Sequence, residues 1–461
     1  LTVLGLVLLV LYRREFTAQG DPTTRWRALW TGLLLLAVST VLGLALLAVD
    51  SRAMEGGWPG FGTALAYVLQ GFVGVSGAIT WRAPHEPTAD AVDAVLLGLG
   101  LMTALTTGWL YFRSPNQPAT MSAADGAQVR GLLATHPDSL GYFATREDKS
   151  LVWSESRKAC IGYRVVGGTM LAGGDPIGDP EAWPGAITAY LKMADDHGWT
   201  PAVLGCSERG GRTWNRLTGF QVLEIGDEAV VDTSAFSLDG RPMRNVRQMV
   251  NRIRRQGYET SMTRVRDLPT EVREQALHDA DRWRTGGTER GFSMATSRVM
   301  DAERDGDDVV ILATRDGVVD GMLQFVPWGP DGMSLDLMRR NPAADPGINE
   351  LLIVDALAGA PDLGISRVSL NFAMFRSTFE RGERLGAGPV LRAWRRVLII
   401  GNRWFQLESL YRFNAKFQPT WVPRFVVYPT VRDLARVSLA MGQAEAFIVF
   451  PTLSWPLRGG R

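Results

Sequence analysis

The sequence is poor in lysine, cysteine and histidine. Only four of its 49 basic residues are lysine, and the arginine that replaces it binds two phosphate oxygens at once through its planar fork. GC-rich coding is an alternative explanation of this bias, so it gives only a weak indication of RNA or anionic lipid as a partner. The two cysteines, Cys160 and Cys206, lack the C-x-x-C spacing of zinc and redox sites. Four histidines give little support to a multi-histidine metal site or a Ser-His-Asp triad, so we expect no metal and no cofactor.

The N-terminal quarter of the chain is apolar. The chain starts at Leu1 within an apolar run, without a methionine or a charged leader, which indicates a fragment of a longer membrane protein. We predict a membrane region over residues 1–113 with spans at about 1–12, 28–49 and 94–112, because about 20 apolar residues cross the hydrocarbon core. These spans contain no charged residue. The segment Trp58–Trp81 is also uncharged, but five glycines and Gln70 make it a poor span.

Two topologies follow for the residues after 113. The loop after the first span carries Arg13, Arg14, Arg25 and Arg27 against only two acidic residues, and the positive-inside rule places this loop in the cytoplasm. If Trp58–Trp81 also crosses, the residues after 113 lie outside the cell. If that segment lies in the interface or re-enters, they lie in the cytoplasm.

After residue 113 the sequence becomes charged and glycine-punctuated, and its periodicity predicts an α/β fold. Two runs have the same order of strands, a crossover helix and a further strand. The first comprises strands at 150–154, 161–166 and 170–173, a helix at 183–197 and a strand at 201–205. The second comprises strands at 309–314, 321–326 and 333–338, a helix at 348–360 and a strand at 368–372. We therefore predict two related α/β units, 127–240 and 241–461, with one large α/β domain as the alternative.

A basic helix is predicted over 243–257, between the two runs. Its apolar residues Val246, Met249, Val250 and Ile253 share one face, and Gly257 provides a stop. Five arginines lie largely on the other faces: Arg244, Arg247, Arg252, Arg254 and Arg255. A basic helix face is often only solvated, but acidic residues normally interleave such a face. No acidic residue does so here, which favours a polyanion as the partner of these five side chains.

Three ordered motifs between about Leu140 and Pro429 resemble the catalytic region of a known family. They are Gly173-Gly-Asp-Pro-Ile-Gly178, followed later by Ile225-Gly-Asp-Glu-Ala229; Ser334-Leu-Asp-Leu-Met-Arg339; and Lys416-Phe-Gln-Pro-Thr-Trp-Val-Pro-Arg424. Together they are similar to the C-terminal region of the multiple peptide resistance factor family, the lysyl- and alanyl-phosphatidylglycerol synthases. The resemblance implies two tandem acetyltransferase-like (GNAT) units preceded by transmembrane helices, in agreement with the repeated order of elements.

The resemblance also implies a function. We expect the chain to transfer an aminoacyl group, lysyl or alanyl, from aminoacyl-tRNA to phosphatidylglycerol at the cytoplasmic face of a bacterial membrane. The reaction would alter surface charge and resistance to cationic peptides. The implied partners are aminoacyl-tRNA, phosphatidylglycerol and the membrane. Access of tRNA favours the topology in which Trp58–Trp81 does not span and residues 113–461 are cytoplasmic.

Matched motifs imply the site residues. The implied catalytic residues are Asp336 and Arg339 of the DLMR motif, Glu289 of an E-x-x-F-S motif, and Lys416. The expected substrate-binding residues are Ser293, Asn371 and Arg424, and the arginines of the helix 243–257 are the expected tRNA contacts. Two departures weaken the match: Asn414 stands where many members have a second lysine, and no histidine lies near Leu323–Trp328, where some members have a catalytic one.

Strand geometry adds a condition to this assignment. In an extended strand Asp336 and Arg339 would point to opposite faces. If both serve one site, the strand must bulge or end at about Leu337. A buried carboxylate with a raised pKa could then take the proton of the lipid hydroxyl, while Arg339 or Lys416 holds the oxyanion or the lipid phosphate.

Other functions remain as alternatives. A GNAT-fold acyltransferase with another acyl donor would need a pyrophosphate loop of the form Q/R-x-x-G-x-G/A, and Arg164-Val-Val-Gly-Gly-Thr169 fails at its last position. An enzyme of peptidoglycan cross-bridge synthesis would not need spanning helices on the same chain. A lipid flippase fragment would show more helices and charged residues within them. A purely structural membrane protein is disfavoured by the set of motifs.

Overall fold

The computed structural model describes residues 22–49, 54, 57–75, 79, 81, 86–112, 121–283, 292–374 and 407–446. The predicted span at 1–12 and the candidate acid Glu289 lie outside these residues. The chain forms two compact units, a smaller one over most of residues 1–115 and a larger one over the remainder.

The smaller unit consists of three helices, α2 (Pro22–Val49), α3 (Phe61–Gly71) and α4 (Glu86–Phe112). By length and composition two apolar stretches, Leu29–Val49 and Ala89–Gly108, are able to cross a membrane. They correspond to the spans predicted at 28–49 and 94–112. Helix α3 has 11 residues, about half of what a crossing needs.

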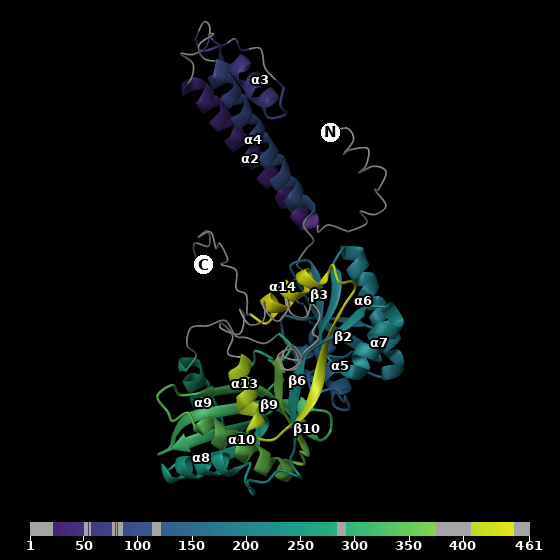
Figure 1. Cartoon of the computed structure of the whole chain (residues 1–461), viewed down its shortest axis with the longest axis vertical. Helices are drawn as coiled ribbons and strands as arrows, with labels where there is room; N and C mark the ends of the chain where they lie inside the picture. The colour runs from purple at the N-terminus through teal and green to yellow at the C-terminus, as the bar shows by residue number, and fades with distance from the viewer. Residues whose placement is uncertain are drawn as a thin grey trace, which may run out of the picture. The chain divides into compact units, whose positions relative to one another are not determined.

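Small residues allow α2 and α4 to lie side by side (Figure 1). The hydroxyls of Ser39 and Thr103 are 3.2 Å apart, and a Cβ on Gly32 would stand 2.7 Å from the Thr107 side chain. Such close packing of small and hydroxyl residues is typical of helices in a membrane. The apolar stretch of α4 that is able to cross starts at Ala89, before the predicted span, and so includes acidic side chains. One of them, Asp93, accepts a hydrogen bond from the Tyr67 hydroxyl at 2.6 Å.

The larger unit is built on a mixed twelve-stranded sheet with the order β1-β2-β3-β5-β12-β6-β11-β10-β9-β8-β7, and β4 pairs with β2. The strands of the first half are β1 (Ser150–Trp153), β2 (Ala159–Val166), β3 (Thr169–Gly173), β4 (Ile177–Gly178), β5 (Thr200–Cys206) and β6 (Gln221–Asp232). Those of the second half are β7 (Glu259–Arg264), β8 (Val309–Arg315), β9 (Val318–Trp328), β10 (Gly332–Arg340), β11 (Arg367–Met374) and β12 (Thr420–Tyr428).

Helices cover both faces of this sheet (Figure 1). They are α5 (Ala123–Leu133), α6 (Trp183–His197), α7 (Glu208–Thr218), α8 (Arg244–Arg255), α9 (Thr270–Arg282), α10 (Ile348–Gly359), α13 (Leu407–Ala415) and α14 (Leu434–Ala444). Short 3-10 turns occur at Gly141–Thr145, Pro180–Ala182, Val265–Asp267 and Ala360–Leu363. Local signals explain several ends: Ser207 caps the start of α7, and Gly219 ends it with a left-handed φ of 73°.

Separate hydrophobic clusters hold the layers together. In the first half, α6 and α7 pack through Trp183, Tyr190 and Trp214 on one face of the sheet. The other face packs on α5 and α14 through Val129 and Val437. In the second half, α8 and α10 cover one face of β8–β10 and α9 covers the other. Each face therefore has its own core, and the strand alternation decides which helix a side chain meets.

The same succession of elements occurs twice. In the first half β2 and β3 are antiparallel, α6 crosses over, and β5 returns parallel to β3. In the second half β9 and β10 are antiparallel, α10 crosses over, and β11 returns parallel to β10. The predicted α/β class with tandem units of one pattern is confirmed.

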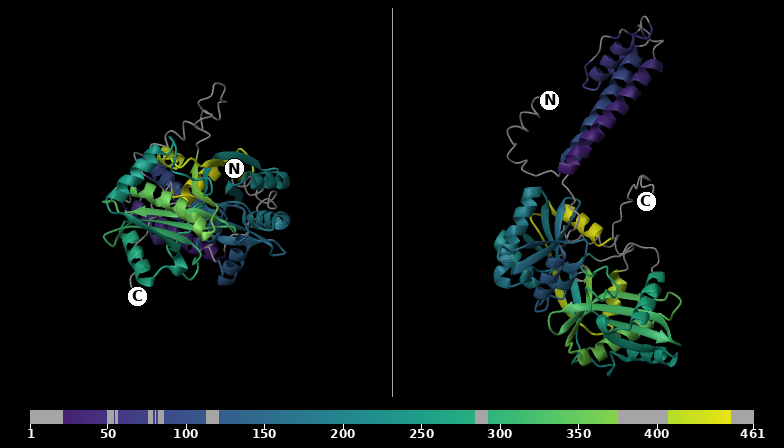
Figure 2. Two further views of the ribbon diagram at one scale, coloured as in Figure 1. Left: turned by 90° about the horizontal axis from the view of Figure 1, so that it is seen from below. Right: turned by 180° about the vertical axis from the view of Figure 1, so that it is seen from behind.

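The C-terminal residues return to the first half of the sheet. Strand β12 lies between β5 and β6, and α14 packs on β2, β3 and β5, as the yellow segment in Figure 2 illustrates. Both elements belong to the predicted unit 241–461. The division of the chain at residue 240 therefore stays a prediction about folding units, while the sheet itself is continuous.

Candidate functional site

Strand β10 bulges at Asp336. Leu335 pairs with Phe325, but Leu337 pairs with Gln324, so Asp336 is the extra residue. The insertion resets the alternation of side chains. As a result Leu337 faces the α9 side of the sheet, and Arg339, also on that side, donates to the Ala280 carbonyl of α9 at 3.1 Å.

Asp336 turns to that same side. Its Oδ2 accepts from Gln324 Nε2 at 3.1 Å, and the Gln324 side chain lies on the face of Leu337, its partner across the strands. The bulge expected near Leu337 is thus present, and it brings Asp336 and Arg339 to one face.

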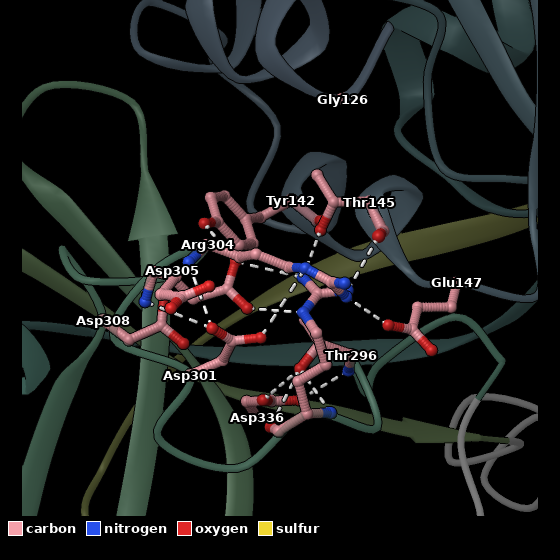
Figure 3. Close-up of polar contacts among 12 residues, drawn as sticks. Gly126, Tyr142, Thr145, Glu147, Thr296, Asp301, Arg304, Asp305, Asp308 and Asp336 are labelled. Carbon is pink, nitrogen blue, oxygen red and sulfur yellow. Dashed lines mark hydrogen bonds and ion pairs between the residues drawn. The ribbon is translucent and has the colours of Figure 1, made fainter. Parts of the chain in front are cut away.

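The carboxylate of Asp336 is held by a neighbouring loop (Figure 3). Thr296 donates its backbone N–H to Oδ1 at 2.7 Å and its hydroxyl to Oδ2 at 2.6 Å. Burial raises the pKa of Asp336 to about 6, and the two Thr296 hydrogen bonds oppose this rise. A carboxylate with this pKa is ionised at neutral pH and accepts a proton more readily than an ordinary aspartate.

Two further aspartates lie beside Asp336. Asp305 forms a buried ion pair with Arg298, with Nε 2.5 Å from Oδ2, and accepts the Tyr142 hydroxyl at 2.9 Å. Asp308 accepts from Gln324 Nε2 at 2.9 Å, and burial together with the charges of Asp305 and Asp336 raises its pKa well above the ordinary value. The site therefore combines several acids around one buried cation.

Asn371 occupies a strained position next to the bulge. The backbone pairing of β10 with β11 ends at Ser334 and Ser369. Beyond this pair the Asn371 side chain connects the two strands, because its Nδ2 donates to the Leu335 carbonyl at 2.7 Å. Asn371 has a φ of 72°, a conformation that L residues adopt at a cost and often at functional sites. Its Oδ1 is buried without a hydrogen-bond partner among the described residues. Asp336, Asn371 and the segment 292–296 together form what we term the β10–β11 junction.

Lys416 lies apart from this junction. Its Nζ is 2.6 Å from Glu350 Oε1 of α10 and lies over the Phe413 ring. The side chain two residues earlier, Asn414, donates instead to the Leu370 carbonyl of β11 at 3.1 Å. Position 414, where the family resemblance implies a second lysine, is therefore the one whose side chain contacts β11 next to Asn371.

Ser293 and Arg424, both expected to bind substrate, are buried and bonded within the protein. Ser293 donates its N–H and its hydroxyl to Glu445. Arg424 is 3% exposed and binds Glu228 through Nε at 2.9 Å and Asp138 through Nη1 at 2.6 Å. Both side chains are therefore bonded within the fold, and their role as substrate contacts stays a prediction.

The sequence motifs meet at a loop that sequence reasoning did not single out, residues 136–140. Asp138 binds Arg424 of the last motif and accepts the N–H of Asp175 of the first motif at 3.3 Å. Burial raises the pKa of Asp138, but the Arg424 charge and hydrogen bonds outweigh it and leave that pKa below its ordinary value. Ser139 accepts from Arg424 at 2.5 Å and offers its carbonyl to Ser334 of the middle motif at 2.8 Å. The motifs therefore share one buried polar network.

The predicted basic helix is present as α8. Acidic residues that are distant in the sequence nevertheless lie beside two of its arginines. Arg252 is 2.8 Å from Asp345 and Arg254 is 2.5 Å from Asp355. Arg244, Arg247 and Arg255 have no ion pair within the described part of the chain. The C-terminal half of α8 lines a shallow hollow with Gln248, Asn251, Arg252, Arg254 and Arg255. The helix therefore offers three uncompensated positive charges.

Comparison with known proteins identifies close relatives. The sequence profile described as "Phosphatidylglycerol lysyltransferase, C-terminal" matches residues 130–428. The lysylphosphatidylglycerol biosynthesis bifunctional protein LysX of Rhodococcus opacus (strain B4) is 44% identical over 448 residues, which are 96% of this chain and 39% of that protein. The protein of the same name from Mycobacterium avium (strain 104) is 44% identical over 459 residues, covering 97% and 38%. The chain thus spans about two fifths of the length of the curated relatives it matches.

Two solved structures share the fold. L-PGS from Bacillus licheniformis superposes with a TM-score of 0.61 at 19% identity, covering 72% of this chain and 99% of that one. A C-terminal domain (DUF2156) from Agrobacterium fabrum superposes with a TM-score of 0.58 at 23% identity, covering 69% and 96%.

Proposed function

Because the chain belongs to the phosphatidylglycerol lysyltransferase family, we propose that it transfers an aminoacyl group from aminoacyl-tRNA to phosphatidylglycerol. The names of its relatives favour lysine as the amino acid. The product would make the membrane surface less negative, which is consistent with a role in resistance to cationic peptides. Two apolar helices support a membrane location, and tRNA access requires the larger unit to be cytoplasmic.

The reaction needs no external energy, since the aminoacyl ester of tRNA is already activated. The lipid hydroxyl oxygen attacks the ester carbonyl carbon and forms a new C–O bond, and the bond from that carbon to the ribose oxygen breaks. The hydroxyl proton passes to a base and then to the ribose oxygen. Positioning of the two substrates, a base, and a donor or cation for the oxyanion are therefore the requirements.

The position and the raised pKa of Asp336 carry this proposal. It lies at a strand bulge, it is buried, and its pKa is about 6, so it is suited to take the hydroxyl proton near neutral pH. Arg339, on the same face, is our candidate for binding the oxyanion. The unpartnered Oδ1 of Asn371 is our candidate for accepting a hydrogen bond from the substrate ammonium or hydroxyl. Glu289 remains a second candidate for the base, and Lys416 a second candidate for the lipid phosphate.

The three uncompensated arginines of α8 are the proposed tRNA contacts. Each phosphate that such a side chain neutralises releases counterions, so binding through α8 must weaken with salt. Their position on one helix, with apolar side chains on the opposite face packed in the core, leaves the basic face available to a polyanion.

Lipid analysis tests the proposal directly. Purified full-length protein with phosphatidylglycerol vesicles and lysyl-tRNA should form lysyl-phosphatidylglycerol, detected by mass spectrometry, and ribonuclease treatment of the donor should abolish it. Alanyl-tRNA and acetyl-CoA serve as alternative donors in parallel reactions. If acetyl-CoA alone yields a product, or if no charged tRNA does, the chain is a different acyltransferase.

A further inference from the structure

The last helix of the described chain ends on a buried carboxylate. Glu445 follows α14 and is 1% exposed. Its Oε2 accepts the backbone N–H of Phe292 at 2.8 Å, and its Oε1 accepts both the N–H of Ser293, at 3.0 Å, and the Ser293 hydroxyl. Three hydrogen bonds from one dipeptide to one carboxylate fix that dipeptide firmly, because bonds to a charged acceptor are stronger than neutral ones.

Two basic side chains lie near this carboxylate. The Nζ of Lys149 is buried and lies 4.1 Å from the centre of the Phe292 ring, and burial lowers the pKa of Lys149 to about 7. Arg164 lies over the same ring at 5.3 Å and donates to the Ala444 carbonyl, the residue before Glu445, at 3.3 Å. Burial raises the pKa of Glu445, whereas the Ser293 hydrogen bonds and the Lys149 charge oppose that rise. Burial outweighs these effects and leaves the pKa of Glu445 above its ordinary value.

The segment held by Glu445 contacts the other two members of the β10–β11 junction. Two residues after Phe292, the carbonyl of Met294 accepts a hydrogen bond from Asn371 Nδ2 at 3.4 Å. Thr296 then donates its backbone N–H and its hydroxyl to Asp336. One short segment is thus fixed at its start by Glu445 and contacts both Asn371 and Asp336 further on.

We propose that Glu445 is a positioning residue for the β10–β11 junction, holding Phe292 and Ser293 so that Thr296 keeps its two hydrogen bonds to Asp336. Glu445 itself contacts no group that would react and acts through the segment 292–296. The inference rests on the proposed function, since it takes Asp336 as the base of that reaction. It links the C-terminal end of α14 to the chemistry of a strand in the other half of the sheet.

The Glu445→Gln variant tests this role through the pH profile. An amide keeps one acceptor but opposes an N–H with its own NH2, so the segment loosens and Thr296 binds Asp336 less well. Burial, the largest effect, and Asp305 raise the pKa of Asp336, while the Thr296 hydrogen bonds and Arg298 lower it. Weaker Thr296 bonds therefore raise that pKa. We expect the acidic limb of kcat/KM to move up by about half a pH unit and kcat to fall about tenfold, with the KM for tRNA unchanged.

Matched variants separate positioning from a loss of folded protein. Thr296→Ala removes one of the bonds directly and should shift the limb in the same direction. Glu208→Gln, an exposed acid on α7, should leave the profile unchanged. Ser293→Ala keeps the Glu445 charge and removes one donor, so it provides a milder test should Glu445→Gln fold poorly. A proportional loss of activity at every pH, without movement of the limb, overturns the proposal, as does wild-type behaviour.

Hydrogen exchange gives a reading that does not depend on activity. In Glu445→Gln the peptides that cover residues 292–296 should exchange faster, while peptides from α6 and β7 should exchange as in the wild type. If the wild-type protein makes no aminoacyl lipid, the proposed function fails, yet the exchange still decides whether Glu445 holds the segment. Unchanged exchange at 292–296 rejects the positioning role in either case.

Discussion

Asp336 should be the most sensitive residue of the β10–β11 junction. Asp336→Asn keeps the size of the side chain and removes the base, so the rate of aminoacyl-lipid formation should fall at least about a hundredfold. In the wild type the base must be ionised, so kcat/KM should decline as the pH falls below about 6, the pKa of this carboxyl. Activity against pH, with tRNA binding and thermal unfolding as checks on folding, measures both effects. Near-normal turnover would make Asp336 a structural partner of Thr296 and move the assignment to Glu289.

Asp305 and Asp308 are neighbours with opposite expected effects on stability. Asp305→Asn breaks a buried ion pair with Arg298 and should destabilise the fold by about 3–5 kcal/mol. Asp308 has a folded pKa raised above its unfolded value. Its contribution to stability is therefore fully present below the unfolded pKa and is lost as the pH rises. The Asp308→Asn variant has no carboxyl to ionise at this position, so it does not lose that stability as the pH rises.

Thermal unfolding at two pH values measures the contrast. Relative to the wild type, Asp308→Asn should gain stability between pH 4 and pH 7, because the wild-type carboxyl resists ionisation over that window. Asp305→Asn should unfold at a lower temperature than the wild type at pH 7. Equal melting temperatures for both variants at pH 7 would contradict the expected contrast.

Single residues were predictable where a motif named them and not where the partner came from elsewhere in the chain. Asp336 and Asn371 both lie at the junction, and the bulge that strand alternation required is present. Thr296 and Glu445 carry no sequence signal, since their roles depend on contacts over 40 and 152 residues. The partners of Arg424 could not be foreseen for the same reason: Asp138, which binds its guanidinium inside the fold, is 286 residues away.

At the scale of elements, the periodicity of the sequence was sufficient for most helices and strands. The predicted helix 183–197 has those bounds as α6, and the basic helix 243–257 is α8 with its ends drawn in by one and two residues. Buried strands with strong apolar character and helices with one apolar face can be recognised from the local sequence pattern alone. The acids that compensate two α8 arginines could not be foreseen, because they lie about 90 to 100 residues further along.

The charges of α8 should contribute unequally to tRNA binding. Replacing Arg244, Arg247 and Arg255 with glutamine should weaken binding and reduce its salt slope by roughly one unit for each lost phosphate contact. Replacing Arg252 and Arg254 should have a smaller effect, since Asp345 and Asp355 already neutralise them.

Fluorescence anisotropy with labelled tRNA at several salt concentrations measures the slopes. Arg212→Gln, an exposed arginine on α7 that pairs with its own helix, is a matched control and should leave the slope unchanged. An unaltered slope in the triple variant would identify α8 as a solvated face.

At the scale of the whole molecule, the arrangement of the two halves exceeded what the sequence could predict. The repeated order of strands and helix indicated two similar units, and both are present. The insertion of β12 between β5 and β6 is a pairing between segments about 200 residues apart, which no local pattern encodes. The polar network of Arg424, Glu228 and Asp138 explains why this insertion is specific, since each buried charge needs the others.

The orientation of the chain in the membrane is the condition on which the proposed reaction depends. A donor tRNA is confined to the cytoplasm, so residues 113–461 must lie there, and α3, at 11 residues, is too short to add a crossing. A single cysteine introduced at Ser51 should react with an impermeant maleimide applied to intact cells, whereas one at Ser122 should react only after lysis. The native thiols Cys160 and Cys206 are both buried, so the wild-type chain provides a low background for this measurement. Labelling at Ser122 in intact cells would place the larger unit outside, where no aminoacyl-tRNA is available, and would reject the transferase function together with the topology.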